Sequence, residues 1–372
     1  METHTRIPCN DLSRGWIARS PEVRDAVESV LSGGWYVQGP GLAAFESELA
    51  QFLGVRHAAG VASGTDALCL AMMAVGCGDG AEIVTAANAG GYASCAAAQV
   101  GARVVYADVD PSTLLMTADT LEPVVGPLTT AVVVTHLYGN IAEVQPILDL
   151  CRPRGIRVIE DCAQAIGGAN CAGRRAGSIG DVAALSFYPT KNLGAAGDGG
   201  AVATDDHQID ASVRSLRNYG WRTKYNVIDG GGRNSRLDEI QAAILRIGLR
   251  GVDGFNQNRR EIVQRYSQAA SDAHVSMVTG AGCETVAHLA VVRSSARDEM
   301  RRFLSERGID TDVHYPVPDH RQPGLRPPAR VASLPVTEAA ADEILTLPCF
   351  PEMTILEIER VAEAIMAFGQ GG

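Results

Sequence analysis

The sequence predicts an α/β protein with a large domain, built on a mainly parallel sheet covered by helices, and a smaller α+β domain. Three observations indicate this. Short apolar runs alternate with helical segments between about residues 58 and 204, which is typical of a parallel sheet covered on both faces. The chain has 372 residues, of which 46% are hydrophobic, so it can bury a large core. After about residue 250 the alternation ends.

Two helices are expected before the alternating region. Residues 21–32 and 42–53 both carry apolar residues at helical spacing, and the Gly-rich stretch 33–41 separates them. A strand-like run over 58–62 then leads into the alternating pattern. The expected strands are 82–85, 103–107, 131–135, 157–160, 182–187 and 201–204, and the helices between them include 65–75, 93–100 and 143–152.

The boundary between the two domains is expected near residue 250. A strong helix is predicted over 235–249, with Ser235 as its N-cap, and a second long helix over about 253–270. Residues 1–250 would then form the large domain and residues 251–372 the small one. In the small domain we expect a strand at 289–292, helices at 297–307, 337–345 and 354–367, and a long Pro-rich loop at 314–335 of the kind that is often functional.

Composition narrows the possible partners and the compartment. The net charge is −11, which argues against general binding to nucleic acid or to an anionic membrane. The nine cysteines form no C-x-x-C pair and no metal-ligand spacing, so we expect free thiols and no metal site. The N-terminal stretch has no apolar segment of signal-peptide type, and no apolar run is long enough to span a membrane. A cytoplasmic location is expected.

Lys191 is the residue around which the functional interpretation is built. The chain has 32 cationic residues, but only Lys191 and Lys224 are lysines. An arginine stays charged, whereas a desolvated lysine amine can lose its proton and attack a carbonyl to form a Schiff base. Lys191 follows an apolar run that ends at Phe187 and precedes a Gly-rich turn. This placement favours chemistry over a solvated surface charge.

Three other stretches fit the same chemistry. Ser63-Gly64-Thr65 stands where a strand-like run gives way to a helix, so free N–H groups and two hydroxyls could bind a phosphate. Asp161 ends an apolar strand and could hold a protonated ring nitrogen. Ser186 could reach the same phosphate. Each feature alone is more often a simple cap, but together with Lys191 they indicate a pyridoxal 5′-phosphate (PLP) site.

These stretches carry a resemblance to a known family. The chain resembles the DegT/StrS family of PLP-dependent nucleotide-sugar aminotransferases, whose fold is the fold type I PLP-transferase fold. The resemblance spans nearly the whole chain, and the lysine segment is highly specific. The matching motifs are SGTDAL (63–68), HLYG (136–139), IEDCAQAIG (159–167), SFYPTKNLGAAGDGGAV (186–202), NSRLDEIQAAIL (234–245) and HYPVPDHRQP (314–323).

The resemblance implies a role for each matching residue. Lys191 would bind PLP covalently and later move the proton between the substrate carbon and the cofactor. Asp161 would contact the ring nitrogen, and Gln164 would lie near the ring hydroxyl. The phosphate would be held by Ser186, Gly64 and Thr65.

Two further contacts are implied across a subunit interface and over the cofactor ring. Asn234 would reach the phosphate of a neighbouring subunit, which implies a homodimer with shared active sites. Relatives often carry an aromatic residue on the ring in the stretch that follows Asn88. Gly90 stands at that position here, so Tyr92 is the ring-stacking residue that we expect.

Within the family, the form of the lysine segment resembles the branch that acts at C3 of dTDP-3-keto-6-deoxyhexoses in amino-deoxysugar biosynthesis. The implied reaction moves the amino group of L-glutamate to the 3-keto group of the nucleotide sugar. The alternatives are PLP chemistry on a keto-cyclitol, deoxysugar dehydration, or a non-catalytic PLP-binding regulator. Dehydratase relatives carry His in place of the lysine, so Lys191 disfavours dehydration.

Two loops could contact the substrate. Arg222, Lys224 and Tyr225 could supply charge and stacking to the diphosphate and the nucleotide, although a solvated loop explains them equally well. The Pro-rich loop could close over the sugar with His314, Tyr315 and His320. The sequence does not define the nucleotide or the stereochemistry of amination.

Overall fold

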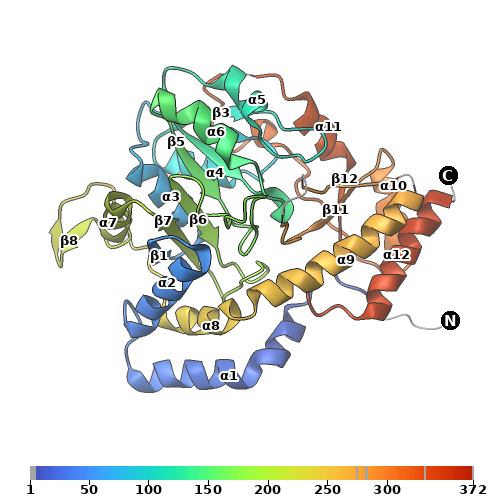
Figure 1. The fold of residues 1–372 in the computed structure, drawn as a ribbon, viewed down its shortest axis with the longest axis horizontal. Helices are drawn as coiled ribbons and strands as arrows, with labels where there is room; N and C mark the ends of the chain where they lie inside the picture. Colours follow the sequence, from blue (N-terminus) through green and yellow to red (C-terminus); the bar gives the residue numbers. More distant parts are fainter. Residues whose placement is uncertain (1–5, 274, 281–283, 331, 371–372) are drawn as a thin grey trace.

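A seven-stranded mixed sheet forms the centre of the protein in this computed structural model, which describes residues 6–273, 275–280, 284–330 and 332–370 (Figure 1). The strand order is β1-β7-β6-β5-β4-β2-β3. The strands from β6 to β3 in this order are parallel, whereas β7 is antiparallel to both of its neighbours. The strands are β1 (His57–Val61), β2 (Glu82–Ala86), β3 (Arg103–Ala107), β4 (Thr129–Thr135), β5 (Arg157–Asp161), β6 (Val182–Ser186) and β7 (Gly200–Thr204). The predicted mainly parallel α/β fold is confirmed.

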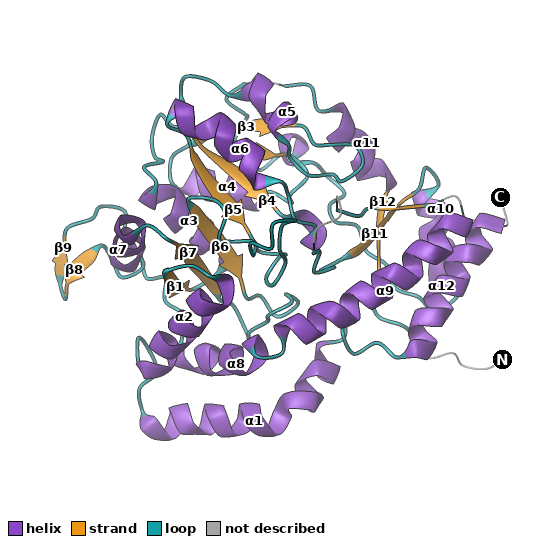
Figure 2. Cartoon of the chain, viewed as in Figure 1, coloured by secondary structure: helices purple, strands orange, loops and turns teal. Residues whose placement is uncertain are grey.

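Helices cover both faces of this sheet (Figure 2). The helices α3 (Gly64–Ala74), α4 (Tyr92–Gln99) and α7 (His207–Leu216) share one apolar cluster with the sheet. The helices α2 (Pro40–Leu53) and α8 (Glu239–Leu249) share another, and α6 (Val144–Cys151) belongs to a third. Buried apolar runs in β4 and β5 fit this two-sided cover.

The C-terminal part builds a second, three-stranded sheet in the order β10-β11-β12. Its strands are β10 (Ser276–Met277), β11 (Ala290–Arg293) and β12 (Ile344–Leu347). Its helices are α9 (Val252–Asp272), α10 (Arg297–Glu306), α11 (Pro335–Glu343) and α12 (Ile355–Gln370), and α5 (Ala118–Leu121) lies in the first part. Because one apolar cluster joins residues of β4 and β5 to residues of β11 and β12, the division at residue 250 stays a prediction.

Several predicted element ends are wrong. The first helix, α1 (Leu12–Gly33), begins nine residues before residue 21, with Asp11 as its N-cap. Helix α8 begins at Glu239 rather than at Ser235, because the Ser235 hydroxyl accepts the Ala62 N–H and is not a cap. The end of the helix predicted over 337–345 is instead the start of β12.

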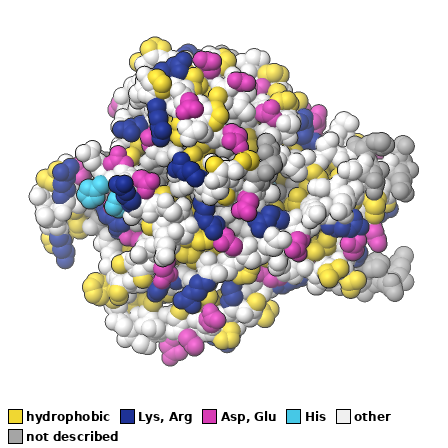
Figure 3. All heavy atoms as spheres, in the orientation of Figure 1, with side chains coloured by type: hydrophobic (Ala, Val, Ile, Leu, Met, Phe, Trp, Pro, Cys, Tyr) yellow, Lys and Arg dark blue, Asp and Glu magenta, His cyan; other side chains and the backbone are white. Residues whose placement is uncertain are grey.

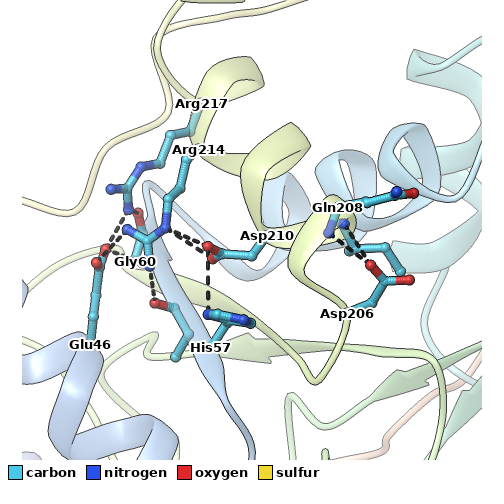
Figure 4. A network of polar contacts seen from close by, with 10 residues as sticks. Glu46, His57, Gly60, Asp206, Gln208, Asp210, Arg214 and Arg217 are labelled. Carbon is cyan, nitrogen blue, oxygen red and sulfur yellow. Dashed lines mark hydrogen bonds and ion pairs between the residues drawn. The ribbon is translucent and has the colours of Figure 1, made fainter. Parts of the chain in front are cut away.

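A buried ion network fixes helix α2 and helix α7 to strand β1 (Figure 4). Glu46 accepts hydrogen bonds from the Gly60 N–H at 2.9 Å, from Arg214 at 2.7 Å and from Arg217. Arg214 also binds Asp210. Burial raises the pKa of Glu46, but the two arginines outweigh it and hold the pKa below its usual value. The sheet edge that precedes α3 is therefore rigidly positioned.

Lys, Arg, Asp and Glu side chains are interspersed over the face seen in Figure 3 rather than gathered by sign. In the part of the chain that the structure describes, no helix has the length and apolar character that a membrane span needs. The expectation of free thiols is wrong for Cys171, which is disulfide-bonded. Among the described residues, the free cysteines are Cys9, Cys69, Cys77, Cys95, Cys151, Cys162 and Cys349, and Cys283 lies outside the described residues.

Candidate functional site

A cavity of about 650 Å³ lies where the carboxyl ends of β5 and β6 meet the N-terminus of α3 and the second sheet. This is the edge at which open α/β sheets bind ligands. Ten residues that the sequence singled out share its lining. They are Ser63, Gly64, Thr65, Tyr92, Asp161, Gln164, Ser186, Lys191, His314 and Tyr315.

Lys191 lies in a turn that follows β6, where its backbone N–H donates to the Tyr188 carbonyl at 2.8 Å. Burial lowers the pKa of the Lys191 amine, and the charge of Asp161 opposes this only in part. A lysine amine in such surroundings releases its proton more easily than an exposed one. This is the property that a nucleophilic or proton-carrying lysine needs.

A hydrogen-bond network behind Lys191 fixes its turn, and sequence reasoning missed it. The Asn192 amide donates to Asn256 Oδ1 at 2.7 Å and to the Val286 carbonyl at 3.0 Å. Asn192 Oδ1 must therefore accept, and the proton of His288 lies on Nδ1, which donates to it at 2.8 Å. Burial, with the charge of Lys191, holds the pKa of His288 well below its usual value. His288 thus presents a neutral ring to the cavity, which it lines.

Asp161 is buried at the end of β5. Its carboxylate accepts the Ala163 N–H at 3.1 Å and the Thr135 hydroxyl at 3.4 Å. Burial raises the pKa of Asp161, and the hydrogen bond from Ala163 and the charge of Lys191 offset part of this rise. A buried carboxylate without a full complement of donors is suited to bind a protonated nitrogen.

Gln164 follows on the same turn, and its amide orientation is fixed by two hydrogen bonds. Its Oε1 accepts the Tyr138 N–H at 2.6 Å, and its Nε2 donates to the Tyr315 hydroxyl at 3.1 Å. The donating end of Gln164 therefore faces the cavity.

The N-terminus of α3 meets Ser186 at the end of β6. The Ser63 hydroxyl caps the helix by accepting the Asp66 N–H at 3.1 Å. A Cβ atom on Gly64 would lie 2.6 Å from Ser186 Cβ, so only glycine permits this approach. The N–H groups of the first turn, with the hydroxyls of Thr65 and Ser186 nearby, form the kind of site that binds a phosphate.

Glu160, His136 and Cys162 lie together beneath Asp161, with ligand-type atoms within 4.8 Å of one another. The arrangement is already saturated by hydrogen bonds. Glu160 accepts from the N–H groups of Gly177, Ile179 and Gly180 and from His136 Nε2, and His136 Nδ1 accepts the Ala142 N–H. We therefore assign this cluster to positioning the β5 end rather than to metal binding.

The structure does not bring every predicted site residue to this cavity within one chain. Arg222 pairs with Asp229 at 3.0 Å, and Lys224 lies over the Tyr225 ring at 5.0 Å. Both lie on the hairpin of β8 (Trp221–Thr223) and β9 (Asn226–Val227), which projects from the body beyond α7 (Figure 1).

Two more predicted residues lie outside the cavity lining. Asn234 is exposed and pairs by a backbone bridge with Asn218. His320 binds Glu338 at 2.9 Å and its ring lies against Tyr106. His320 therefore does not line the cavity, and its contact with the sugar stays a prediction.

The residues present fit PLP. The cavity combines one buried lysine with a lowered pKa, one buried carboxylate, a fixed amide donor and a helix N-terminus crowded against a serine. These groups would serve the aldehyde, the ring nitrogen, the ring hydroxyl and the phosphate of the cofactor respectively.

Comparison with known proteins gives a consistent picture. The model of the DegT/DnrJ/EryC1/StrS aminotransferase family matches residues 18–366. The chain is 40% identical over 351 residues to the dTDP-3-amino-3,4,6-trideoxy-alpha-D-glucose transaminase of Micromonospora megalomicea subsp. nigra, across 92% of this chain and 94% of that protein. It is 38% identical over 367 residues to the UDP-N-acetyl-3-dehydro-alpha-D-glucosamine 3-aminotransferase of Acidithiobacillus ferrooxidans, across 98% of both chains.

A solved structure has the same fold. The crystal structure of DesV from S. venezuelae in complex with a ketimine intermediate superposes with a TM-score of 0.94 at 38% identity. The superposition covers 98% of this chain and 99% of DesV.

Proposed function

Because the chain belongs to the DegT/DnrJ/EryC1/StrS aminotransferase family, we propose that it moves the amino group of L-glutamate to the 3-keto group of a nucleotide-linked 6-deoxyhexose. The chain is a PLP-dependent aminotransferase. When bound, PLP draws electrons away from the reacting carbon. The observation that carries the proposal is the convergence of Lys191, Asp161, Gln164 and Ser186 on one cavity.

Each of these residues has a defined task in the proposed reaction. The buried amine of Lys191 holds the cofactor and then carries a proton to or from the substrate carbon. Asp161 holds the proton on the ring nitrogen, and Gln164 Nε2 donates to the ring hydroxyl. Ser186 and the first turn of α3 hold the phosphate. His288 and the network of Asn192 keep the lysine turn in position.

The choice of C3 is supported by two relatives whose names both describe 3-amino sugars, one linked to dTDP and one to UDP. We favour a dTDP-linked 3-keto-6-deoxyhexose, in agreement with the form of the lysine segment. A direct test incubates the purified protein with PLP, L-glutamate and a panel of dTDP- and UDP-linked 3-keto and 4-keto sugars. The expected result is loss of the visible cofactor band with L-glutamate and an amino sugar from the dTDP-linked 3-keto substrate, detected by mass.

Lys191→Ala should abolish both half-reactions. In the wild-type protein loaded with PLP, borohydride reduction should label the peptide that contains Lys191. Lys224→Ala, which removes the other lysine, should leave the response to L-glutamate intact. A cofactor band that L-glutamate does not change would contradict the proposal and favour a PLP-binding regulator.

We further propose a homodimer with shared active sites, because the cavity of one chain lacks cations for a diphosphate. Among the described residues that line it, Lys191 is the only lysine or arginine, whereas Asp198 and Asp312 add negative charge. The projecting hairpin carries Arg222 and Lys224 outside its own cavity. Apolar side chains are exposed on the same hairpin, including Val227 at 61%, which is typical of an interaction surface.

Mixing two inactive variants tests this arrangement. Lys191→Ala lacks the amine but keeps the hairpin cations, and Arg222→Ala/Lys224→Ala keeps the amine but lacks the cations. If a neighbouring chain supplies the hairpin, half of the dimers in an equimolar mixture are mixed dimers, and each has one intact site. About a quarter of the wild-type activity at low nucleotide-sugar concentration should then return. No gain over the separate variants would contradict shared sites.

We propose a cytoplasmic location, which the seven free thiols support and the disulfide of Cys171 does not.

A further inference from the structure

The turn before α4 contains Gly90, which lies close to the ring of Tyr315. Gly90 has φ +77°, a conformation that residues with a Cβ atom rarely adopt. A Cβ atom on Gly90 would also lie 2.8–2.9 Å from three ring atoms of Tyr315. The Tyr315 ring therefore occupies the space that any larger side chain at position 90 would need.

Tyr315 faces the cavity with its polar end fixed. Its hydroxyl accepts a hydrogen bond from Gln164 Nε2 at 3.1 Å, and the ring lines the cavity together with Lys191 and Asp161. Because Gln164 is held in turn by the Tyr138 N–H, the position of the Tyr315 ring depends on the same turn that carries Asp161. The Tyr315 ring thus shares one wall of the cavity with Asp161 and Gln164, the predicted contacts of the cofactor ring.

The loop that carries Tyr315 is fastened to the turn that carries Gly90. The Asp319 N–H donates to the Ala87 carbonyl at 2.8 Å, and the Asp319 carboxylate accepts the Ser94 hydroxyl at 3.0 Å. Nearby, the Tyr138 hydroxyl donates to the His314 carbonyl at 2.5 Å. The loop is therefore fastened on both sides of Tyr315, and its Asp319 side is bonded to residues that flank the Gly90 turn.

Tyr92, the residue that the sequence suggested for stacking, lies differently. Its side chain is 50% exposed, and it meets Tyr315 edge-on with ring centroids 6.2 Å apart and an interplanar angle of 72°. Tyr92 thus packs against the Tyr315 ring in a T-shaped arrangement.

We propose that Tyr315 is the aromatic residue that packs on the cofactor ring in this chain, in the place that Gly90 leaves open. Tyr92 then supports Tyr315 rather than the cofactor. This inference rests on the proposed function, because it assumes that the cavity binds PLP. Gly90 and Tyr315 act as a size-matched pair, so an aromatic residue at position 90 and the observed place of Tyr315 exclude each other.

The test measures PLP binding to the apoprotein by the visible absorption of the bound cofactor, without any turnover. Tyr315→Leu removes the ring and should weaken binding roughly three- to tenfold, the range expected for one aromatic contact. Tyr315→Phe keeps the ring and loses only the hydrogen bond to Gln164, so its affinity should lie between those of Tyr315→Leu and the wild type. Tyr92→Leu removes only a ring that packs against Tyr315, so it should weaken PLP binding less than Tyr315→Leu does.

Thermal melting of each apoprotein shows whether the variant is folded. If Tyr315→Leu does not fold, Gly90→Ala gives a second route, because its new Cβ atom must displace the Tyr315 ring and should also weaken PLP binding. Wild-type affinity in Gly90→Ala, or a loss of affinity confined to Tyr92→Leu, would overturn the assignment to Tyr315. A wild-type chain that binds no PLP would overturn the proposed function as well, so the two failures are distinguishable.

Discussion

Glu160→Gln is the substitution whose effect the structure defines most closely. The Glu160 carboxylate is fully buried, one residue before Asp161. Its Oε1 accepts the N–H groups of Ile179 and Gly180, both at 2.7 Å. Its Oε2 accepts His136 Nε2 and the Gly177 N–H, both at 3.0 Å. Four donors therefore converge on one carboxylate, two on each oxygen.

Glutamine keeps the shape but replaces one oxygen with an NH₂ group. Whichever oxygen is replaced, two buried donors lose their acceptor and face another donor. His136 cannot adapt by moving its proton, because its Nδ1 already accepts the Ala142 N–H at 3.0 Å. A hydrogen bond to a charged group contributes about 1.5–3 kcal/mol, so the loss should be roughly 3–6 kcal/mol. That is a large part of the total stability of a typical protein, about 5–15 kcal/mol.

The assay is urea unfolding followed by circular dichroism, with Glu48→Gln as the control. Glu48 forms a partly exposed ion pair with Arg246 at 2.6 Å, and such pairs contribute about 1 kcal/mol or less. Glu160→Gln should lower the free energy of unfolding several times more than Glu48→Gln does. A loss for Glu160→Gln that equals the control would refute the account of a saturated carboxylate.

The same variant predicts a pH dependence. Burial raises the pKa of Glu160, but the hydrogen bonds from His136 and from the backbone N–H groups outweigh it and hold the pKa below its usual value. A carboxylate with a lowered folded-state pKa stabilises the protein fully above its unfolded pKa, about 4.3, and this contribution is lost as the pH falls through the folded pKa. The stability difference between wild type and Glu160→Gln should be constant from about pH 6 to 8 and should narrow below about pH 4.

Two further predictions concern charges near the site. Asp161→Asn removes a charge that raises the pKa of Lys191, so the pH midpoint for reductive methylation of Lys191 in the apoprotein should fall. The labelling profile of the exposed Lys224 serves as the control. An unchanged midpoint for Lys191 would contradict the coupling between Asp161 and Lys191. Glu46→Gln should leave the buried Arg217 without a carboxylate (Figure 4) and lower the free energy of unfolding by roughly 3–5 kcal/mol. Urea unfolding of Glu46→Gln, with Glu48→Gln as the control, measures this loss of unfolding free energy. A loss below about 1 kcal/mol would show that Arg217 finds another acceptor.

The parts of the fold that sequence reasoning predicted are those with a strong local signal. The strands from β2 to β7 are short, apolar and buried, and their alternation with helices was sufficient to predict the mainly parallel sheet. The ends of α1 and α8 were wrong because caps depend on tertiary contacts. Ser235 has the chemistry of an N-cap, but its hydroxyl is used by the Ala62 N–H from a distant strand.

The candidate site shows the same limit. Lys191, Asp161 and Ser186 stand at strand ends, so a local pattern could mark them. His288 and Asn256 have no such signal, because their roles depend on hydrogen bonds to Asn192 across 96 and 64 residues. Asn192 could have been suspected because it follows Lys191 in the sequence. Its hydrogen-bond partners could not have been predicted in this way.

The structure explains why position 191 needs a lysine rather than an arginine, but it gives no such reason for position 224. Lys191 is held where burial lowers its pKa, and an arginine there would stay charged and could not bind an aldehyde. Lys224 is exposed on the hairpin over the Tyr225 ring, where an arginine could bind a diphosphate equally well. Lys224→Arg should therefore preserve the KM for the nucleotide sugar if its task is only to supply charge. A raised KM in that variant would show that the compact ammonium group itself is required.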